Sequence, residues 1–568
     1  MSRSASSPRR HQGGAALALA LVGTAAGSLA AAVPPASAAA PTAIRVGGPS
    51  LPADAKVALV GSAADLRGRP FRVLDGAGRV VLRGKLTAAE GKPAPWRRLA
   101  RADLSRLRRA GSYRVRAAGL TSRPWVVRRD AQRAPIAAIL QYFAANADGS
   151  EPSPVHGPAH LDDAVVASGP YAGQRFDLTG GWMDAGDMLK FTSTTAYATA
   201  ALQAAARLDP ADAPALLATA DVGVRWLLKA HPAPGLFIAQ VGDERDHDLG
   251  FRDPAGDDGS GKEGIATRFA YPNMGGDLGG AVALALAMAA ARAPEAAKPA
   301  LIGAAREWYA AGVAADGPSP KLPAPAGDFY TGENPSDALA SGAAALYRVT
   351  GERPYLDDAR SRLGVQQLDG RLGWNALAGF GQAELCGVLG APAPDAEARG
   401  GACSGLGLQG GQAVRRSWEI GPFGTPGYLT WGQTGENGGA GAVAALAARA
   451  GSLNRGLDGR GTAVNARDWL LGRNPWGASF VAGYGPKSPR HPHHWASERG
   501  PGLPRGAVVG GPAPLKDILD QSFGRPRGGP FSTARATYED RLEDYVTSEP
   551  AIDYAAGSIL LLAALAAP

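Results

Sequence analysis

Residues 180–191 read GGWMDAGDMLKF and place two carboxylates, Asp184 and Asp187, three positions apart in a glycine-rich turn. The Ala-rich segment that follows, 192–207, is predicted to be a helix. Carboxylates held at a turn beside apolar and aromatic side chains are typical of acid–base sites, because burial and a neighbouring like charge both shift a pKa. The alternative is structural: Asp187 caps a helix that begins near Met188, and Asp184 only forms the turn. This stretch alone supports both interpretations equally.

Helical patterns dominate the chain from about residue 134 to its end. The predicted helices are 192–207, 213–230, 279–292, 298–315, 335–350, 438–450 and 462–472. They are rich in small residues and apolar on more than one face, which suits helices packed in two layers. Two long segments between them, 241–273 and 472–541, exceed the length of ordinary connections, so we expect them to carry function.

The region before these helices, residues 41–130, has a β pattern. Short alternating or apolar runs, separated by turn formers such as Asp75-Gly76, predict strands at 56–60, 70–75, 79–84, 111–116 and 124–127. Strands at this spacing in about 90 residues favour a small β-sandwich. A chain of 568 residues is also too long for one ordinary core, so two domains are expected.

The first 38 residues have the features of a signal peptide. Arg3, Arg9 and Arg10 precede an apolar stretch, 15–33, and Ala36-Ser37-Ala38 is a small-residue cleavage site. We predict a secreted protein, and leave open whether the general or the twin-arginine pathway exports it. No later apolar run is long enough for a membrane span.

Charge is distributed unevenly along the chain. Residues 41–133 contain 21 Lys and Arg against 6 Asp and Glu, whereas the residues after 133 carry a net charge of −10. No nucleic-acid-binding motif accompanies the basic region, so we expect no nucleic-acid partner. The basic region has two functional interpretations: it attracts the acidic helical region, or it contacts an acidic cell-surface polymer. An ordinary solvated surface is favoured over both.

The two cysteines are Cys386 and Cys403. In an oxidising compartment a disulfide that closes this short loop is the default expectation. A metal site or a catalytic thiol is disfavoured, because neither cysteine has a Cys or His partner at ligand spacing.

A second candidate carboxylate lies near the C-terminus, before an apolar helix that is predicted to reach residue 566. Pro550 suits the first position of this helix, which would make Glu549 its N-cap. A helix N-terminus favours an ionised carboxylate, whereas a general acid must be protonated near neutral pH. For Glu549 to serve as an acid, burial and the nearby aspartates would have to raise its pKa by more than the helix N-terminus lowers it. Otherwise Glu549 is only a cap.

Three of the eight histidines, His491, His493 and His494, fall within four residues. A metal site is one interpretation. Pro489 and Pro492 make the segment extended, which would spread the ligands apart, so a sugar-contacting loop is the favoured interpretation.

Three stretches in this order, 180–191, 470–495 and 539–556, resemble the motifs of glycoside hydrolase family 9, the inverting cellulase family, in its members with an N-terminal immunoglobulin-like domain. The first matches the family pattern GGWYDAGDYxKY, and the second matches LLGxNPxxxSFVTGYG followed by PHHR. The third matches DxRxDYxxNExAxDYNA, with substitutions and one extra residue. The resemblance implies a mainly α fold: an (α/α)6 barrel over 134–568 after the immunoglobulin-like β-sandwich.

The resemblance also implies roles for individual residues. Asp187 would be the general base that deprotonates the attacking water, Asp184 would help to hold that water, and Glu549 would be the general acid. In an inverting hydrolase the acid and the base lie on opposite faces of the sugar, with room for a water molecule. The residues expected to contact sugar are His493, His494, His247, Tyr554, Trp374, Trp431 and Trp182.

The sequence departs from the family pattern at several sugar-site positions. Trp495 replaces the arginine of PHHR, Ser548 and Ala555 replace asparagines, and Leu249-Gly250 replaces an aromatic pair. These departures leave the catalytic class better supported than the substrate.

Metal expectations follow from the same resemblance. The zinc site of some relatives needs a cysteine where Ala159 stands, so we predict no zinc there. Calcium is common in the family near the positions of Thr331, Gly332 and Asp337, but Ala338 replaces an expected carboxylate, so structural calcium stays open. Catalysis itself should need no cofactor.

We therefore expect a secreted, monomeric endoglucanase-like enzyme that cleaves cellulose, mixed-linkage glucan or cellodextrins, with the β domain buttressing the barrel. One alternative is an exo-acting hydrolase of short oligosaccharides or amino sugars. A second is a carbohydrate-binding protein without activity, which the presence of all three carboxylates disfavours.

Overall fold

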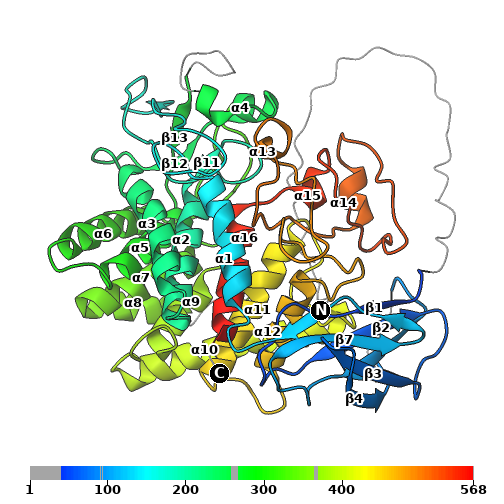
Figure 1. Ribbon diagram of the computed structural model, residues 1–568. Helices are drawn as coiled ribbons and strands as arrows, with labels where there is room; N and C mark the ends of the chain where they lie inside the picture. The colour runs from blue at the N-terminus through cyan, green and yellow to red at the C-terminus, as the bar shows by residue number, and fades with distance from the viewer. Residues whose placement is uncertain (1–39, 90, 92–93, 258–266, 364–368, 567–568) are drawn as a thin grey trace, which may run out of the picture.

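The computed structural model describes residues 40–89, 91, 94–257, 267–363 and 369–566. The predicted signal peptide lies outside the described residues. Strands precede helices along the chain, and the β region lies against one side of the helical region (Figure 1). None of the helices in the described ranges combines the length and apolar character needed to cross a membrane.

The β region consists of two sheets around a common core. One sheet has the order β1-β2-β6-β5, and the other has the order β4-β3-β7-β8 with β9 also paired to β7. Their bounds are β1 Ala43–Arg45, β2 Val57–Ser62, β3 Pro70–Asp75, β4 Val80–Lys85, β5 Thr87–Ala88, β6 Arg98–Asp103, β7 Gly111–Ala117, β8 Leu120–Thr121 and β9 Trp125–Val127. Successive side chains of a strand point to opposite faces of the sheet. Accordingly, Phe71 and Val73 of β3 point into the core, and Arg72 between them is exposed. Strand β6 was not predicted from the sequence, because two of its inward residues, Ala100 and Ala102, are small and are interleaved with arginines.

Within the residues that the structure describes, twelve long helices alternate between an outer and an inner layer. The outer helices are α1 Arg133–Ala145, α3 Ala213–Lys229, α6 Lys298–Ala314, α8 Arg353–Leu363, α10 Ala396–Ile420 and α12 Gly459–Leu470. The inner helices are α2 Thr192–Leu208, α5 Gly276–Ala290, α7 Pro335–Thr350, α9 Ala378–Cys386, α11 Gln433–Arg449 and α16 Ile552–Ala566. The expected (α/α)6 barrel class is thereby confirmed.

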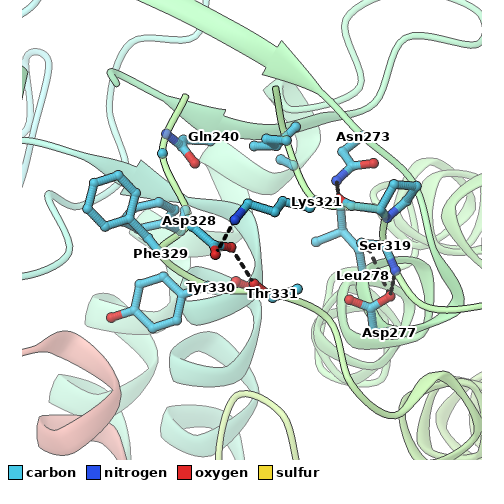
Figure 2. Close-up of a pocket in the computed structure, with 16 residues that line it drawn as sticks. Gln240, Asn273, Asp277, Leu278, Ser319, Lys321, Asp328, Phe329, Tyr330 and Thr331 are labelled. Carbon is cyan, nitrogen blue, oxygen red and sulfur yellow. Dashed lines mark hydrogen bonds and ion pairs between the residues drawn. The ribbon is translucent and has the colours of Figure 1, made fainter. Parts of the chain in front are cut away.

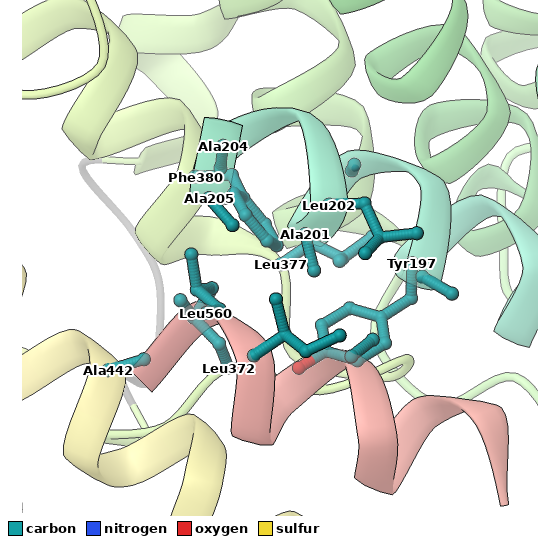
Figure 3. Close-up of a cluster of buried hydrophobic side chains, with 14 of the residues drawn as sticks. Tyr197, Ala201, Leu202, Ala204, Ala205, Leu372, Leu377, Phe380, Ala442 and Leu560 are labelled. Atoms are coloured by element: carbon teal, nitrogen blue, oxygen red, sulfur yellow. The ribbon is translucent and has the colours of Figure 1, made fainter. Parts of the chain in front are cut away.

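Small residues let neighbouring inner helices pack closely. A Cβ at Gly280 of α5 would lie 2.2 Å from the backbone of Ala338 in α7, so only glycine permits this approach. In the centre, Tyr197 of α2, Phe380 of α9 and Leu560 of α16 meet in one buried cluster (Figure 3). The disulfide predicted between Cys386 and Cys403 is formed, and it joins the end of α9 to α10.

Short elements gather at one end of the barrel. They form a small sheet of order β10-β13-β12-β11 and several short helices (Figure 1). Their bounds are β10 Val165–Val166, β11 Lys190–Phe191, β12 Ile238–Val241, β13 Phe269–Pro272, α4 Glu244–Asp248, a 3-10 turn at Pro254–Gly256, α13 Trp495–Glu498, α14 Leu515–Leu519 and α15 Tyr545–Ser548.

The β region is attached to the barrel through a buried ion cluster. Arg467 of α12 is fully buried, and its guanidinium lies 2.6 Å from Asp54 of the β region and 2.8 Å from Asp468. Arg123 of the β region donates across the same seam to the carbonyl of Leu471.

Replacing Arg467 by alanine is expected to lower the free energy of unfolding by about 3–5 kcal/mol, because Asp54 and Asp468 would lose their buried counter-charge. Urea unfolding of the mature chain measures the change. Arg399→Ala, an exposed position on α10, is the control and should change it by less than about 0.5 kcal/mol. Equal effects for the two variants would contradict the proposed role of the cluster.

Candidate active site

The Gly-rich turn at 180–191 lies at the barrel end that carries the short elements. Lys190–Phe191 forms strand β11, and α2 begins only at Thr192 with Phe191 as its N-cap. The helix-cap interpretation of Asp187 is therefore wrong. Gly186 is required where it stands, because a Cβ there would lie 2.1 Å from the carbonyl oxygen of His493, so the turn and the histidine loop pack backbone to backbone.

Asp184 is almost completely buried, with 1 % of its surface exposed. One carboxylate oxygen accepts a hydrogen bond from the Thr194 hydroxyl at 2.5 Å, and the other accepts one from the Tyr330 hydroxyl at 2.6 Å. Burial raises the pKa of Asp184 to about 7, although both hydrogen bonds act to lower it.

Asp187 is paired with His247 of α4. The carboxylate lies 2.8 Å from Nδ1 of His247, and its other oxygen accepts the backbone N–H of Leu189 at 3.2 Å. Burial acts to raise the pKa of Asp187, but the hydrogen bond and charge of His247 outweigh it and leave that pKa below its ordinary value. The same pair raises the pKa of His247 to about 9. Asp187 is thus held ionised.

Glu549 lies in extended backbone between α15 and α16. The predicted N-cap role is wrong: α16 begins at Ile552, and Pro550 instead forms a β-bridge with Val509. The backbone N–H of Gly186 donates to the Glu549 carboxyl at 3.3 Å, which brings the C-terminal segment onto the aspartate turn. Burial, followed by the charge of Asp187, raises the pKa of Glu549 to about 8.

The three carboxyl groups therefore differ in protonation near neutral pH. Glu549 is mostly protonated below pH 8, whereas Asp187 is ionised. Two neighbouring titratable groups whose environments move their pKa values apart are suited to act as acid and base in one reaction.

Five of the expected sugar-contacting residues keep some surface exposed. His493 donates from Nδ1 to the carbonyl of Leu542, and its ring lies 4.7 Å from that of Phe251. Trp374 packs edge-on against Tyr330 at 5.0 Å, Trp431 is 40 % exposed, and Tyr554 lies against the backbone of Gly432. His247 is exposed as well.

Two other expected sugar contacts are contradicted. Trp182 is 1 % exposed and packs edge-on against Phe143, so it belongs to the core. His494 is fully buried; it donates from Nε2 to Asn146 and accepts the backbone N–H of Ala496 at Nδ1. Burial accordingly lowers the pKa of His494 to about 3, and it supports the site from behind as a neutral ring.

The substitution at Trp495 also has a structural explanation. At this position, which matches the arginine of the PHHR pattern, the Trp495 ring is fully buried and packs with Met183 and Met188 under the aspartate turn. An apolar contact therefore stands in place of a charged side chain.

Several residues of the site were not singled out from the sequence. Tyr330 binds Asp184, and it lines a narrow cavity together with Phe191 and Phe329 (Figure 2). Tyr545 lies 5.6 Å from the ring of His493 and 5.7 Å from that of Trp431. The only signal in the sequence was an aromatic pair in a loop, and such pairs are common in cores.

Replacing Tyr330 by phenylalanine is expected to lower kcat by about 10- to 100-fold, because a hydrogen bond to a buried carboxylate is lost. The pKa of Asp184 would also rise, so the low-pH limb of the kcat profile should move to higher pH. Cellohexaose turnover across pH measures both effects. Tyr171→Phe, which removes a hydroxyl bound to the Pro234 carbonyl, is the control; a Tyr330 variant with the control's kinetics would contradict the assignment.

A closed ring of ion pairs supports the site from below. Acidic and basic side chains alternate around it, and each is at most 5 % exposed: Asp148, Lys190, Asp163, Arg268, Asp246, Arg252, Asp257 and His160. Arg268 also donates to the carbonyl of Met188 in the aspartate turn, and Asp246 directly precedes His247. The ring thus connects the two segments that hold Asp187 and its partner.

This ring contains the one group of three acidic, histidine or cysteine side chains, within the described ranges, that could share a metal ion: Asp148, His160 and Asp163. The ammonium of Lys190 lies 2.5 Å from Asp148 and 2.7 Å from Asp163, and it supplies the positive charge that a metal would bring. These residues therefore do not suit zinc. Near the expected calcium positions, Asp337 accepts the backbone N–H of Leu377, and the Thr331 hydroxyl donates to Asp328.

Comparison with known proteins agrees with this geometry. The family model described as glycosyl hydrolase family 9 matches residues 134–562, and the model described as cellulase N-terminal ig-like domain matches residues 50–122. Endoglucanase 14 of Arabidopsis thaliana is 29 % identical over 480 residues, which cover 75 % of this chain and 92 % of the relative.

Solved structures show the same similarity. A mutant of a thermostable endoglucanase from Alicyclobacillus acidocaldarius is 25 % identical, with a TM-score of 0.78 over 93 % of this chain and all of that one. A metagenome-derived family 9 endoglucanase is also 25 % identical, with a TM-score of 0.77 over 93 % of this chain and 99 % of the other. Because the family model spans most of the chain and the fold agrees over nearly its whole length, the chain belongs to glycosyl hydrolase family 9.

Proposed function

We propose that this protein is an endoglucanase-type glycoside hydrolase that cleaves β-1,4-glucosidic bonds with inversion, using Glu549 as general acid and Asp187 as general base. The observation that carries the proposal is the opposed protonation of these two groups: the pKa of Glu549 is raised to about 8, and that of Asp187 is lowered. The relatives described as endoglucanases support a glucan substrate.

The proposed reaction needs one water molecule and no covalent intermediate. Asp187 accepts a proton from this water as its oxygen attacks the anomeric carbon. Glu549 donates its proton to the glycosidic oxygen as the bond to the leaving sugar breaks. His247 keeps Asp187 ionised until the water is bound, and Asp184, anchored by Thr194 and Tyr330, helps to orient that water.

The site walls suit a sugar chain. Trp374 and Trp431 offer partly exposed rings on which apolar sugar faces can lie, and His493 and Tyr554 offer polar edges for hydroxyl groups. In the proposed arrangement these four residues bind substrate, while Trp182 and His494 only support the fold.

The test is product release from cellohexaose, carboxymethylcellulose and chitosan oligomers, with the anomeric form of the first product followed by NMR. Cleavage of both glucans with an α-anomer product is expected. Cleavage confined to short or amino-sugar oligomers would move the substrate to another class. Retention of the β-configuration, or a folded protein without activity on any β-glycan, would refute the proposed mechanism.

We further propose that residues 1–38 are removed on export, that residues 41–130 form a separate domain which buttresses the barrel, and that the secreted enzyme acts as a monomer. Mass spectrometry of the exported protein and light scattering test the first and the last of these statements. The contacts of Asp54 and Arg123 with the barrel support the buttressing role.

Chelation with EDTA is expected to leave kcat on cellohexaose unchanged. Each active-site carboxyl group already has protein hydrogen-bond donors, and no step of the proposed reaction uses a metal. Thermal unfolding in the same buffers tests for structural calcium separately: a fall in Tm that only added calcium reverses would support the site near Asp337. Loss of kcat well below Tm would contradict the prediction.

A further inference from the structure

We propose that the outer face of the β4-β3-β7 sheet binds an acidic polysaccharide, one that carries a carboxylate on successive sugar units. We call this surface the arginine face; it consists of Arg72, Arg83, Lys85, Arg114 and Arg116, all of them exposed. The site lies in the β region, away from the carboxylates of the barrel, and it does not depend on glucan cleavage.

Strand register brings these cations together. Arg72 of β3 pairs directly with Arg83 of β4 on one side and with Arg116 of β7 on the other. Residues directly opposite each other in antiparallel strands share a face, so the three arginine side chains leave the sheet in a row, on strands about 4.8 Å apart. Lys85 and Arg114 lie one repeat further along their strands on the same face.

This row has no internal counter-charge. The neighbouring carboxylates are engaged elsewhere, since Asp65 pairs with Arg67 at 2.5 Å and Asp75 pairs with Arg79 at 2.9 Å. Within the described part of the chain, Arg72, Arg83 and Arg116 make no ion pair of their own. Like charges directly opposite each other destabilise a sheet. A row of three is therefore a cost to folding that an external polyanion would offset.

The chemistry of the face selects among polyanions. Arginine forks bind carboxylates in two-pronged hydrogen bonds, and a flat row of them suits an extended chain with regularly spaced carboxylates. No aromatic side chain lies at the exposed positions of these three strands to stack nucleic-acid bases. Among the described residues before Arg133 there is also no helix that could enter a groove. The observations favour a polyuronide over DNA or RNA.

The charge of the rest of the protein would orient the complex. Residues 134–568 carry a net charge of −10, so an acidic polymer is repelled from the barrel and attracted to the β region. In Figure 1, β3 and β4 lie at the outer margin of the molecule. A polymer bound there would tether the enzyme and leave the catalytic end of the barrel free for neutral glucan.

The experiment uses the mature full-length protein and polygalacturonate as the probe. Affinity is measured at low and at physiological ionic strength for the wild type, for Arg72→Gln/Arg83→Gln/Arg116→Gln, and for the charge-matched control Arg399→Gln/Arg415→Gln/Arg455→Gln on the helical region. All three control arginines are exposed. We expect the arginine-face variant to lose affinity by about tenfold or more, and the control to lose less than about twofold.

A single variant, Arg72→Glu, adds an independent readout. It places a carboxylate between Arg83 and Arg116, so it should abolish polygalacturonate binding and at the same time raise Tm by relieving the like-charge row. Turnover of neutral cellohexaose should be the same in every variant as in the wild type. If the proposed hydrolase function is wrong, the wild type will fail to cleave cellohexaose, and the binding measurements will not be affected. The inference is overturned if both triple variants lose affinity equally, or if duplex DNA or anionic lipid vesicles bind the wild type as tightly as polygalacturonate.

Discussion

Glutamine in place of Glu549 is expected to lower kcat on cellohexaose by about 10²–10⁴-fold, because the leaving oxygen would depart without its proton. The high-pH limb of the wild-type profile should begin near pH 8, where Glu549 loses that proton, and it should vanish in the variant. KM should change little, since glutamine keeps the shape and most contacts of the side chain. Steady-state kinetics across pH measure all three quantities.

A substrate with an activated leaving group separates this role from a structural one. In a dinitrophenyl cellobioside the leaving group, dinitrophenolate, is stable as an anion and needs no protonation. The Glu549→Gln variant should therefore cleave this substrate at nearly the wild-type rate. Equal losses on cellohexaose and on the aryl substrate would show that Glu549 does not act as the acid. Glu397→Gln, at an exposed position on α10, is the matched control and should behave as wild type on both substrates.

Asparagine in place of Asp187 is expected to lower kcat by a similar factor, about 10²–10⁴-fold, but on both substrates alike. The attacking water needs its base whatever group departs. His247 would lose the negatively charged partner that raises its pKa to about 9, so its titration, followed by NMR, should move toward the ordinary histidine value.

The control for this variant is Asp221→Asn, which removes a carboxylate on the outer helix α3 that pairs with Arg292. It should leave both kcat and the His247 titration unchanged. An Asp187 variant that kept activity on the aryl substrate would assign the base to another residue, and Asp184 would be the next to test.

Many of the helices could be predicted from local sequence patterns. The helices predicted at 192–207, 298–315 and 335–350 agree with α2, α6 and α7 to within one residue, because their small-residue patterns have a clear helical period. The 25-residue helix α10 was missed, since its glycines have low helix propensity. It forms because Gly407 and Gly410 fit against Ser452 and Ala447, contacts that no local pattern contains.

The composition of the site was predictable in part. The three carboxylates stand in recognisable motifs, so their residue types and order could be assigned from the sequence. Their partners could not: Tyr330 lies 146 positions from Asp184, and His247 lies 60 positions from Asp187. Nor did the sequence reveal that Trp182 and His494 are buried, because a motif shows which residues are present and not which way they face.

The sequence by itself determined the family of the chain and its three acidic groups, because these depend on short motifs, and local periodicity determined that residues after 134 are mainly helical. The (α/α)6 class followed from the family resemblance. Only the tertiary structure decided which carboxyl group is protonated. A pKa depends on burial and on charges brought together from distant segments: Gly186 and Asp187 lie beside Glu549, and His247 lies beside Asp187. The arginine face likewise exists only through strand register, which aligns residues 72, 83 and 116 across a sheet.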